Sequence, residues 1–559
     1  MTHFIKNAIP VFLITGLCSA ILLMASVPPV SRDALTHHLA VPKLYVNIGK
    51  IVELPDIIPS YYPQLLDLLY CIPLLWGNDI IPKYIHFSFA LLTAWLIYTF
   101  VRKRLDHVYA LWASLFFISL PVIVKLSVTV YVDLGLIFFS FSSLLALLKW
   151  KNKAFSLKWL IVSGVFCGLA MGTKYNGIIT CFILSAFTPL IFLRTLQSDF
   201  RKEDDSLSYK LRRHRTFIAL GYSLCFFLTA MIVFSPWMIK NYKWTGNPIY
   251  PLYNEHFSSI KTDSIQNSTV SHFSLRKVIY KEKWWETASI PIRIFFQGQD
   301  DQPVLFDGQL NSLLFFLPLA VILKPLKRQT HGFELKVFLC FAIIFILAVY
   351  LKQDMRIRYI GPALPCLVVA STFGVKQLIS FKGRRHWQLR NISIVNIIIG
   401  ATMALLFSAN FFYTKDLFKK IAPLEYLSGR ISRHTYIETH RPEYNVLVYA
   451  NKHLNGDIKL LGFFLGNRRY YSDHPINFDW QGFRRLIKNP KTLCDIHSAF
   501  KGYSHFIIFY PKFNQWVASE FTDTEKIRFI EFINANTKLK YSNGEHGIYE
   551  IIDFSCDKP

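Results

Sequence analysis

Long apolar blocks alternate with short polar loops over the first three quarters of the chain. Most blocks have roughly 17–24 residues, the length that an α-helix needs to cross a hydrocarbon core of about 30 Å. We therefore expect eleven membrane-spanning helices, at residues 8–27, 84–101, 107–127, 131–148, 158–173, 177–193, 216–238, 309–324, 335–351, 359–379 and 391–412. Residues 61–82 are also apolar, but prolines and Asp67 interrupt them, so they predict a short helix at the membrane interface.

The composition agrees with a membrane protein. Of the 559 residues, 52% are hydrophobic and only 18% are charged, whereas a soluble protein carries about 25% charged residues. The sequence therefore predicts a polytopic α-helical membrane protein. The net charge of +26 would also fit a nucleic-acid partner, but Lys and Arg lie in short clusters between the apolar blocks. Such clusters set membrane topology, so we expect no nucleic-acid partner.

A basic loop follows every even-numbered predicted helix. These loops lie at 102–104, 149–153, 194–215, 324–328 and 382–390. Because basic loops stay in the cytoplasm, we expect a cytoplasmic N-terminus. The outer face of the membrane then carries the large loops 28–83 and 239–308.

The C-terminal portion, which this topology also places outside, differs in character from the rest. From Glu425 onward it is polar, and short apolar runs such as 458–466 and 505–510 alternate with helical patterns. That alternation predicts a small α/β domain. The expected division is a membrane domain, 1–412, and an extracytoplasmic α/β domain, 413–559.

The sequence carries few processing or redox signals. The N-terminal apolar run also fits a signal peptide, but it lacks a clear cleavage site, so we expect an uncleaved first helix. Cys494 and Cys556 would be able to pair in an oxidising compartment, although their spacing does not decide it. No CxxC spacing typical of a metal site occurs.

Two carboxylates lie at the same membrane face on this topology. Asp33 follows the first predicted helix, and Asp133 begins the fourth. Taken singly, Asp33 fits a solvated loop residue, and Asp133 fits a helix N-terminus that favours negative charge. Two carboxylates at one depth beside a long outer loop indicate a functional site instead.

Several cations share that outer face, against the positive-inside trend. They are Lys174, Lys240, Lys243, Arg356 and Arg358. Such side chains anchor helices at the interface by snorkelling, and they are also the usual partners of phosphate. Together with a carboxylate base they predict transfer from a lipid phosphate. The carboxylate deprotonates an acceptor hydroxyl, which attacks an anomeric carbon, and the cations hold the departing phosphate.

Five motifs carry a resemblance to a known family. They are SRDALTHH at 31–38, Asp133, GTKYNG at 172–177, PWMIKN at 236–241 and RYIGPALP at 358–365. Because these motifs occur in this order, the chain resembles the GT-C fold membrane glycosyltransferases of families 39 and 83 over residues 1–410. These include the protein O-mannosyltransferases and the lipid A aminoarabinose transferases.

The resemblance implies an enzyme that uses a polyprenyl-phosphate-linked sugar. Asp33 is then the base, and Asp133 orients the acceptor or the surroundings of Asp33. The donor phosphate is expected to contact Lys174, Lys240, Arg356 and Arg358, and the acceptor side of the first outer loop is expected to include His37, Tyr61 and Tyr62. The acceptor is a protein, lipid or glycan hydroxyl among membrane lipids, and the location is a bacterial inner membrane.

No cofactor is expected. The resemblance requires no metal for the chemistry, and adjacent histidines such as His37 and His38 point about 100° apart on a helix. A divalent metal at this His pair remains an alternative to a metal-free site.

The chain departs from the family pattern at two places. Ala34 stands where the family often has Glu, and SYYPQ at 60–64 replaces an element that usually contains lysine, so Arg32 or Lys43 would have to take that role. The motifs TGNPIYP at 245–251 and RRYYSD at 468–473 have no assigned chemistry.

Two other functions stay open. One is a flippase or transporter of a lipid-linked saccharide, although such proteins place ionisable residues near the bilayer midplane on broken helices. The other is a ligase that moves a whole glycan from its lipid carrier.

Overall fold

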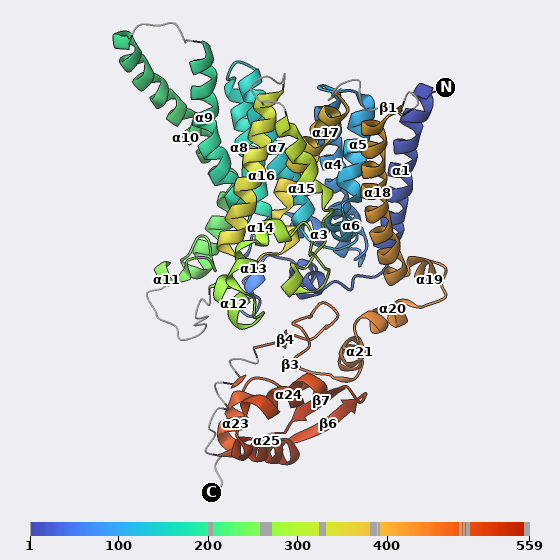
Figure 1. Ribbon diagram of the computed structural model, residues 1–559. Coiled ribbons are helices and arrows are strands. Elements are labelled where there is room, and N and C mark those ends of the chain that lie inside the picture. Colours follow the sequence, from blue (N-terminus) through green and yellow to red (C-terminus); the bar gives the residue numbers. More distant parts are fainter. Residues whose placement is uncertain are drawn as a thin grey trace.

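The computed structural model describes residues 2–199, 205–257, 271–323, 331–380, 388–389, 392–479, 483–484, 487 and 492–552. A helix bundle forms one part, and a smaller α/β domain lies beyond one end of it (Figure 1). Cys556 falls outside the described residues, so its pairing with Cys494 stays a prediction.

Seven described helical segments are long and apolar enough to cross a membrane. They are α1 (Thr2–Ala25), α4 (Ile81–Arg102), α7 (Asp133–Asn152), α9 (Gly177–Asp199), α10 (Asp205–Thr245), α16 (Gly332–Lys352) and η6 (Ile357–Ala363) continued by α17 (Leu364–Ser380). An eighth is the pair α5 (His107–Ser119) and α6 (Pro121–Ser127), which bends by 66°. The block expected to span the membrane at 107–127 thus forms two helices with a bend between them. Pro121 has no N–H to continue the helical hydrogen bonds across the junction.

The remaining apolar blocks form helices of other lengths. Block 158–173 is α8 (Leu157–Thr173), block 309–324 forms α15 (Leu313–Leu319) and η4 (Ala320–Leu323), and block 391–412 falls in α18 (Ile394–Ile421). The polytopic helical class is therefore confirmed, whereas the number of eleven spans stays a prediction. Helix α18 also continues past residue 412, where the membrane domain was expected to end.

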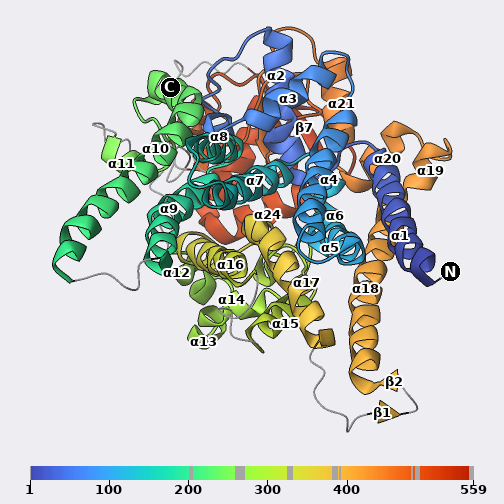
Figure 2. The same ribbon diagram turned by 90° about the horizontal axis from the view of Figure 1, so that it is seen from above.

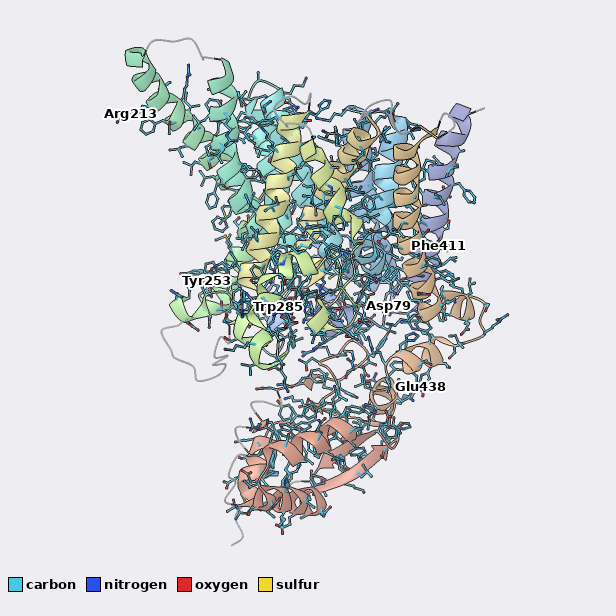
Figure 3. All side chains as sticks on the ribbon, in the orientation of Figure 1. Asp79, Arg213, Tyr253, Trp285, Phe411 and Glu438 are labelled. Atoms are coloured by element: carbon cyan, nitrogen blue, oxygen red, sulfur yellow. The ribbon has the colours of Figure 1, made fainter. Side chains whose placement is uncertain are left out.

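Apolar side chains cover the outside of the bundle as well as its core. Phe12, Phe182, Ile232 and Phe411 are 77%, 68%, 71% and 63% exposed. Phe411 lies on the side of the bundle in Figure 3. Large apolar side chains exposed around a helix bundle are typical of contact with lipid.

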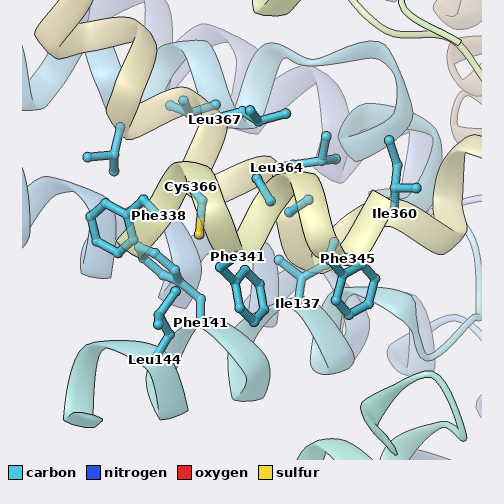
Figure 4. Packing of buried hydrophobic residues seen from close by; sticks show 14 of the residues in the cluster. Ile137, Phe141, Leu144, Phe338, Phe341, Phe345, Ile360, Leu364, Cys366 and Leu367 are labelled. Carbon is cyan, nitrogen blue, oxygen red and sulfur yellow. The ribbon is translucent and has the colours of Figure 1, made fainter. Parts of the chain in front are cut away.

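Helix α7 lies inside the bundle, with α4, α8, α9 and α16 around it (Figure 2). Its Phe141 packs against Phe338 of α16, and Leu144 joins the same core (Figure 4). Gly361 of η6 faces Ile137, and a Cβ there would lie 2.8 Å from the Ile137 side chain. The missing side chain lets η6 approach α7, which brings the start of both elements together at the end of the bundle that faces the C-terminal domain.

Short elements cover the end of the bundle that faces the C-terminal domain (Figure 1). They are η1 (Ala34–His38), α2 (Ala40–Ile48), η2 (Ile58–Tyr61), α3 (Leu65–Leu74), α11 (Asn254–Phe257), α12 (His272–Val278), α13 (Trp284–Ala288), α14 (Ile290–Arg293) and η3 (Pro303–Leu305). Helix α3 is the short apolar helix expected within 61–82. Two short antiparallel strands, β1 (Gln388–Leu389) and β2 (Ile392–Ser393), lie at the opposite end, just before α18.

The C-terminal domain is a five-stranded mixed sheet with helices on both faces, which confirms the α/β prediction. The strand order is β4 (Ile476–Asn477), β3 (Leu460–Phe463), β5 (His505–Phe509), β7 (His546–Ile551) and β6 (Thr537–Ser542). Strand β3 runs parallel to β4 and β5, and β7 is antiparallel to β5 and β6.

Alternate residues of the strands enter two separate cores, as the period of two in a strand requires. Phe506 and Ile508 pack with α23 (Leu493–Ala499), α24 (Tyr510–Glu520) and α25 (Asp523–Asn536), whereas Ile507 packs on the other face with α21 (Tyr444–His453). Two short helices, α19 (Pro423–Leu427) and α20 (Arg433–His440), link this domain to α18.

Candidate active site

Asp33 lies at the end of the bundle that faces the C-terminal domain, in the loop that follows α1. It occupies the position before the π-helical turn η1. Its Oδ2 forms an ion pair with Nη1 of Arg358, the second residue of η6, at 2.6 Å. The two side chains are 22% and 10% exposed, so the pair faces a cavity instead of bulk solvent.

Asp133 and Lys174 form a second ion pair beside the first. Asp133 begins α7 and is 1% exposed, and its Oδ1 accepts from Lys174 Nζ at 2.6 Å. Its other oxygen has no hydrogen-bond partner among the described residues. Lys174 Nζ lies 4.9 Å from the ring centre of Tyr359, the residue after Arg358. The two pairs are therefore neighbours, and the GTKYNG turn brings Lys174 to them.

His86 fixes the backbone at the start of α7, a role that the sequence did not reveal. The Leu134 N–H donates to His86 Nε2 at 3.0 Å, and His86 Nδ1 lies 3.0 Å from the carbonyls of Leu126 and Thr129. These contacts assign Nδ1 as the protonated nitrogen. His86 thus ties α4 to the turn that positions Asp133.

The electrostatic surroundings keep Asp33 ionised. Burial raises the pKa of Asp33, but the charges of Arg358, His37 and His38 and the hydrogen bond from Arg358 lower it further, so the pKa lies well below its usual value. Burial and then the charge of His38 hold the pKa of His37 well below its usual value. An ionised carboxylate is the state that a general base needs before reaction.

A cavity of about 650 Å³ adjoins Asp33 and Arg358. Its lining includes eight Lys and Arg side chains but only three carboxylates. The membrane domain contributes Asp33 and Arg358, and the C-terminal domain contributes Arg441 and Arg468. The size lies in the range of small-molecule sites, about 300–1,000 Å³, and the excess of cations favours an anionic ligand.

Arg441 differs from the other cations of the cavity wall described above in its partners. It makes no ion pair in the part of the chain that the structure describes. Its Nη1 donates to the His440 carbonyl at 2.9 Å, and its Nε is buried without a partner. Burial and then the charge of Arg468 lower the pKa of Arg441.

Lys125 and Arg356 lie at another part of the same wall. Lys125 Nζ is within 3.3–3.5 Å of carboxylate oxygens of Asp300, Asp301 and Asp307. Arg356 Nη1 also reaches Asp307, at 3.4 Å. An ammonium group occupies the centre of these three carboxylates. Across the described segments no group of three or more His, Cys, Asp or Glu side chains is arranged to hold a metal ion.

Three of the predicted site residues lie elsewhere. Lys240 donates to the carbonyls of Ser60 and Tyr62, at 2.8 and 3.4 Å. The Tyr61 hydroxyl donates to Glu53 at 2.6 Å, and the Tyr62 ring packs against Tyr175. None of Lys240, Tyr61 and Tyr62 is among the described residues that line the cavity.

The structure thus groups Asp33, Asp133, Lys174, Arg358 and the neighbouring His37. Of the predicted site residues, Asp33, Arg356 and Arg358 line the cavity. Sequence reasoning missed Arg441 and Arg468. The RRYYSD motif, which begins at Arg468, was the only signal for either residue, and it carried no recognisable chemistry.

Comparisons with known proteins agree with this architecture. Residues 80–203 match the family model described as dolichyl-phosphate-mannose-protein mannosyltransferase. No curated protein sequence matches the chain. ArnT from Cupriavidus metallidurans in the apo state superposes with a TM-score of 0.54 at 13% identity, covering 96% of this chain and 97% of ArnT. ArnT bound to undecaprenyl phosphate gives a TM-score of 0.53 at 12% identity, with the same coverage.

The oligosaccharyltransferase of Archaeoglobus fulgidus in the apo form gives a TM-score of 0.49 at 13% identity, covering 98% of this chain and 75% of that protein. The likeness to ArnT over nearly the whole of both chains shows that this protein has the GT-C fold. With its apolar helices, it is an integral membrane protein. The resemblance noted in the sequence is confirmed as a likeness of fold.

Proposed function

We propose that the protein is a membrane glycosyltransferase that moves a sugar from a polyprenyl phosphate to an acceptor hydroxyl. The observation that carries the proposal is the Asp33–Arg358 pair on a cation-rich cavity at the outer end of a GT-C bundle. Two comparisons support it. The match at residues 80–203 is to a model of dolichyl-phosphate-mannose-dependent enzymes, and ArnT, which has the same fold, has been solved with undecaprenyl phosphate bound.

From this geometry we infer a role for each member of the site. Asp33 accepts the proton of the acceptor hydroxyl as the oxygen attacks the anomeric carbon. The bond between that carbon and the phosphate oxygen breaks, and the lipid phosphate leaves with the electron pair. Arg358 and Lys174 stabilise the charge on the leaving phosphate, while Arg356 lies farther along the same wall.

Asp133 acts on the site indirectly, through Lys174. Because it is almost fully buried and bonded to Lys174, it fixes the ammonium group beside Tyr359. We assign it this orienting role and do not place it at the reacting atoms.

The proposal also specifies the face of the membrane at which the reaction takes place. Reaction takes place at the extracytoplasmic face of a bacterial inner membrane, with the N-terminus in the cytoplasm. Support comes from the basic loops 102–104 and 149–153, which lie at the end of the bundle opposite the C-terminal domain (Figure 1). The acceptor is a protein, a lipid or a glycan, and no metal is required.

The flippase alternative fits the site less well. Asp33, Asp133, Lys174 and Arg358 all lie where helices begin or end, whereas transporters place such groups near the midplane. A glycan ligase would share the same chemistry. It is distinguished from a transferase of a single sugar by its product, because it would add a whole glycan to the acceptor.

The decisive experiment compares wild type with Asp33→Asn in membranes supplied with radiolabelled polyprenyl-phosphate sugars. We expect labelling of an acceptor by wild type and a fall of about 100-fold or more in the variant, since loss of a general base typically costs this much. Asp523→Asn, which changes a carboxylate that is 95% exposed in the C-terminal domain, is the matched control. If wild type transfers no sugar but moves labelled lipid between leaflets, the flippase replaces the transferase.

A further inference from the structure

The C-terminal domain contacts the chain on both sides of Asp33. On the downstream side, the carbonyl of Leu35 accepts hydrogen bonds from the backbone N–H groups of Arg469 and Tyr470, at 3.0 and 3.1 Å. Leu35 belongs to the π-helical turn that begins directly after Asp33. The wide turn of a π-helix is uncommon and is frequently found at functional sites.

Side chains add two further anchors. Upstream of Asp33, the Tyr471 hydroxyl donates to the Pro29 carbonyl at 2.7 Å. Farther downstream, Lys43 Nζ donates to the carbonyls of Tyr470 and Ser472, at 3.0 and 3.3 Å, and to Asp473 at 2.8 Å. The segment 469–473 therefore holds the chain at Pro29, Leu35 and Lys43.

Apolar packing joins the same two parts. Tyr470, which is 9% exposed, belongs to a buried cluster with Ala34, Leu35 and Val132, the residue before Asp133. Its hydroxyl donates to Asp79 at 3.2 Å, and Asp79 also pairs with Arg433 at 2.5 Å. Figure 3 shows Asp79 at the end of the bundle that faces the C-terminal domain.

We propose that residues 469–473 of the C-terminal domain position Asp33 for catalysis by clamping the loop that carries it. Lys43 and Tyr471 are positioning residues in this clamp, since neither contacts the Asp33 carboxylate or lines the cavity. The inference rests on the proposed function. It gives the C-terminal domain a part in the chemistry that is distinct from selection of the acceptor.

The test uses the purified full chain with Tyr471→Phe and Lys43→Met. Each variant removes side-chain anchors but leaves every residue of the cavity in place. We expect kcat for sugar transfer, per folded molecule, to fall by tenfold to about 100-fold, because small displacements of a catalytic group cost this much. The KM for the polyprenyl-phosphate sugar should stay within about twofold. A residue that only stabilises the fold would lower the folded fraction and leave kcat per folded molecule unchanged.

Three control variants separate the clamp from unrelated losses. Tyr449→Phe removes a similar tyrosine hydrogen bond, to the Lys540 carbonyl, within the C-terminal domain, and should keep the wild-type kcat. Lys540→Met removes a lysine ion pair, with Glu550, elsewhere in the C-terminal domain, and should also stay close to wild type. Lys43→Arg keeps a cation able to reach the two carbonyls that Lys43 contacts, and should recover most of the loss seen with Lys43→Met.

Amide hydrogen exchange provides a readout that does not depend on the enzyme's activity. The clamp predicts faster exchange across residues 31–41 in Tyr471→Phe and Lys43→Met than in wild type or Tyr449→Phe. Wild-type kcat in both variants, or unchanged exchange in this segment, would overturn the inference. If wild type itself transfers no sugar, the proposed function fails, while the exchange data still show whether the clamp exists.

Discussion

At the residue scale, opposing effects determine the charge of Asp33. Burial raises the pKa of its carboxyl, and Arg358, His37 and His38 together lower it by more. The carboxylate is thus ionised, but as long as Arg358 holds it, it is a weak base. A donor phosphate that draws Arg358 toward itself would release the carboxylate and raise its basicity, which links donor binding to activation of the acceptor.

This balance predicts how activity depends on pH when Arg358 is removed. In Arg358→Gln, burial still raises the pKa of Asp33, and only the weaker effects of the two histidines lower it. A base works above its pKa, so activity is lost as pH falls through that value. We expect the acid limb of the profile of kcat/KM against pH to move upward by about one unit or more, besides a loss of donor affinity.

Arg356→Gln is the matched control, because Arg356 pairs with Asp307 and not with Asp33. It should weaken donor binding without moving the acid limb. An acid limb at the wild-type position in Arg358→Gln would contradict the assignment of Asp33 as the base.

The second ion pair predicts an effect on stability. Lys174→Met leaves Asp133 charged, 1% exposed and unpaired, and breaking a buried pair in this way costs about 3–5 kcal/mol in the free energy of unfolding. Adding Asp133→Asn removes the uncompensated charge, so the double variant should regain much of the stability but not the transfer activity. Thermal unfolding in detergent measures both.

The exposed pair Lys540–Glu550 supplies the comparison for Lys174→Met. Its side chains are 33% and 38% exposed, and Lys540→Met should cost no more than about 1 kcal/mol. Equal losses for Lys540→Met and Lys174→Met would show that burial does not strengthen the Asp133–Lys174 pair.

At the scale of elements, a glycine stripe on α8 sets its distance from α10. Gly164, Gly168 and Gly172 recur every four residues and so lie on one face of the helix. A Cβ on Gly168 would lie 2.5 Å from Val233 Cβ and 2.6 Å from the Ala230 carbonyl oxygen of α10. Small residues at such spacing allow close helix packing in membranes. Helix α8 ends beside Lys174, so this contact also supports the site.

We therefore expect Gly168→Ala to destabilise the protein by about 1–3 kcal/mol, the usual cost of overpacking. The neighbouring carbonyl belongs to the backbone and cannot move aside alone. The melting temperature in detergent is the measurement. Gly221→Ala, in α10, adds a Cβ with no atom within 4 Å, and it should leave the melting temperature unchanged or raise it. Equal melting temperatures for Gly168→Ala and wild type would mean that the two helices can separate at little cost.

At the scale of the whole molecule, the sequence predicted the parts of the site that follow from topology. Blocks of apolar residues and basic loops were enough to place Asp33, Asp133, Lys174 and Arg358 at one face, because hydropathy dictates which helix ends share a compartment. The sequence also predicted β3 and β5, whose apolar runs are short and well separated.

What the sequence did not predict depends on contacts between distant segments. Arg441 and Arg468 reach the cavity only because the C-terminal domain packs against the loop of Leu35. Lys240 was predicted at the correct face, but its ammonium group is bonded to backbone carbonyls of residues 60 and 62. No local pattern reports either fact, since both arise from tertiary packing.

The fold also makes the orientation of the chain in the membrane testable with one pair of labelled positions. The first outer loop and the C-terminal domain lie at one end of the bundle, and the loop after α4 lies at the other (Figure 1). Residues of that first loop and of the C-terminal domain line the cavity. In a variant without the nine native cysteines, Asp523→Cys should react with a membrane-impermeant maleimide in intact spheroplasts. Lys103→Cys, in the basic loop after α4, should react only after the membrane is permeabilised.

The labelling result bears directly on the chemistry. If Asp523→Cys reacts from outside, then Asp33 faces the extracytoplasmic space, where nucleotide sugars are absent and a lipid-linked donor must supply the sugar. The reverse labelling would place Asp33 at the cytoplasmic face. The positive-inside assignment of all five basic loops would then be wrong, and a soluble activated sugar would compete with polyprenyl phosphate as the donor.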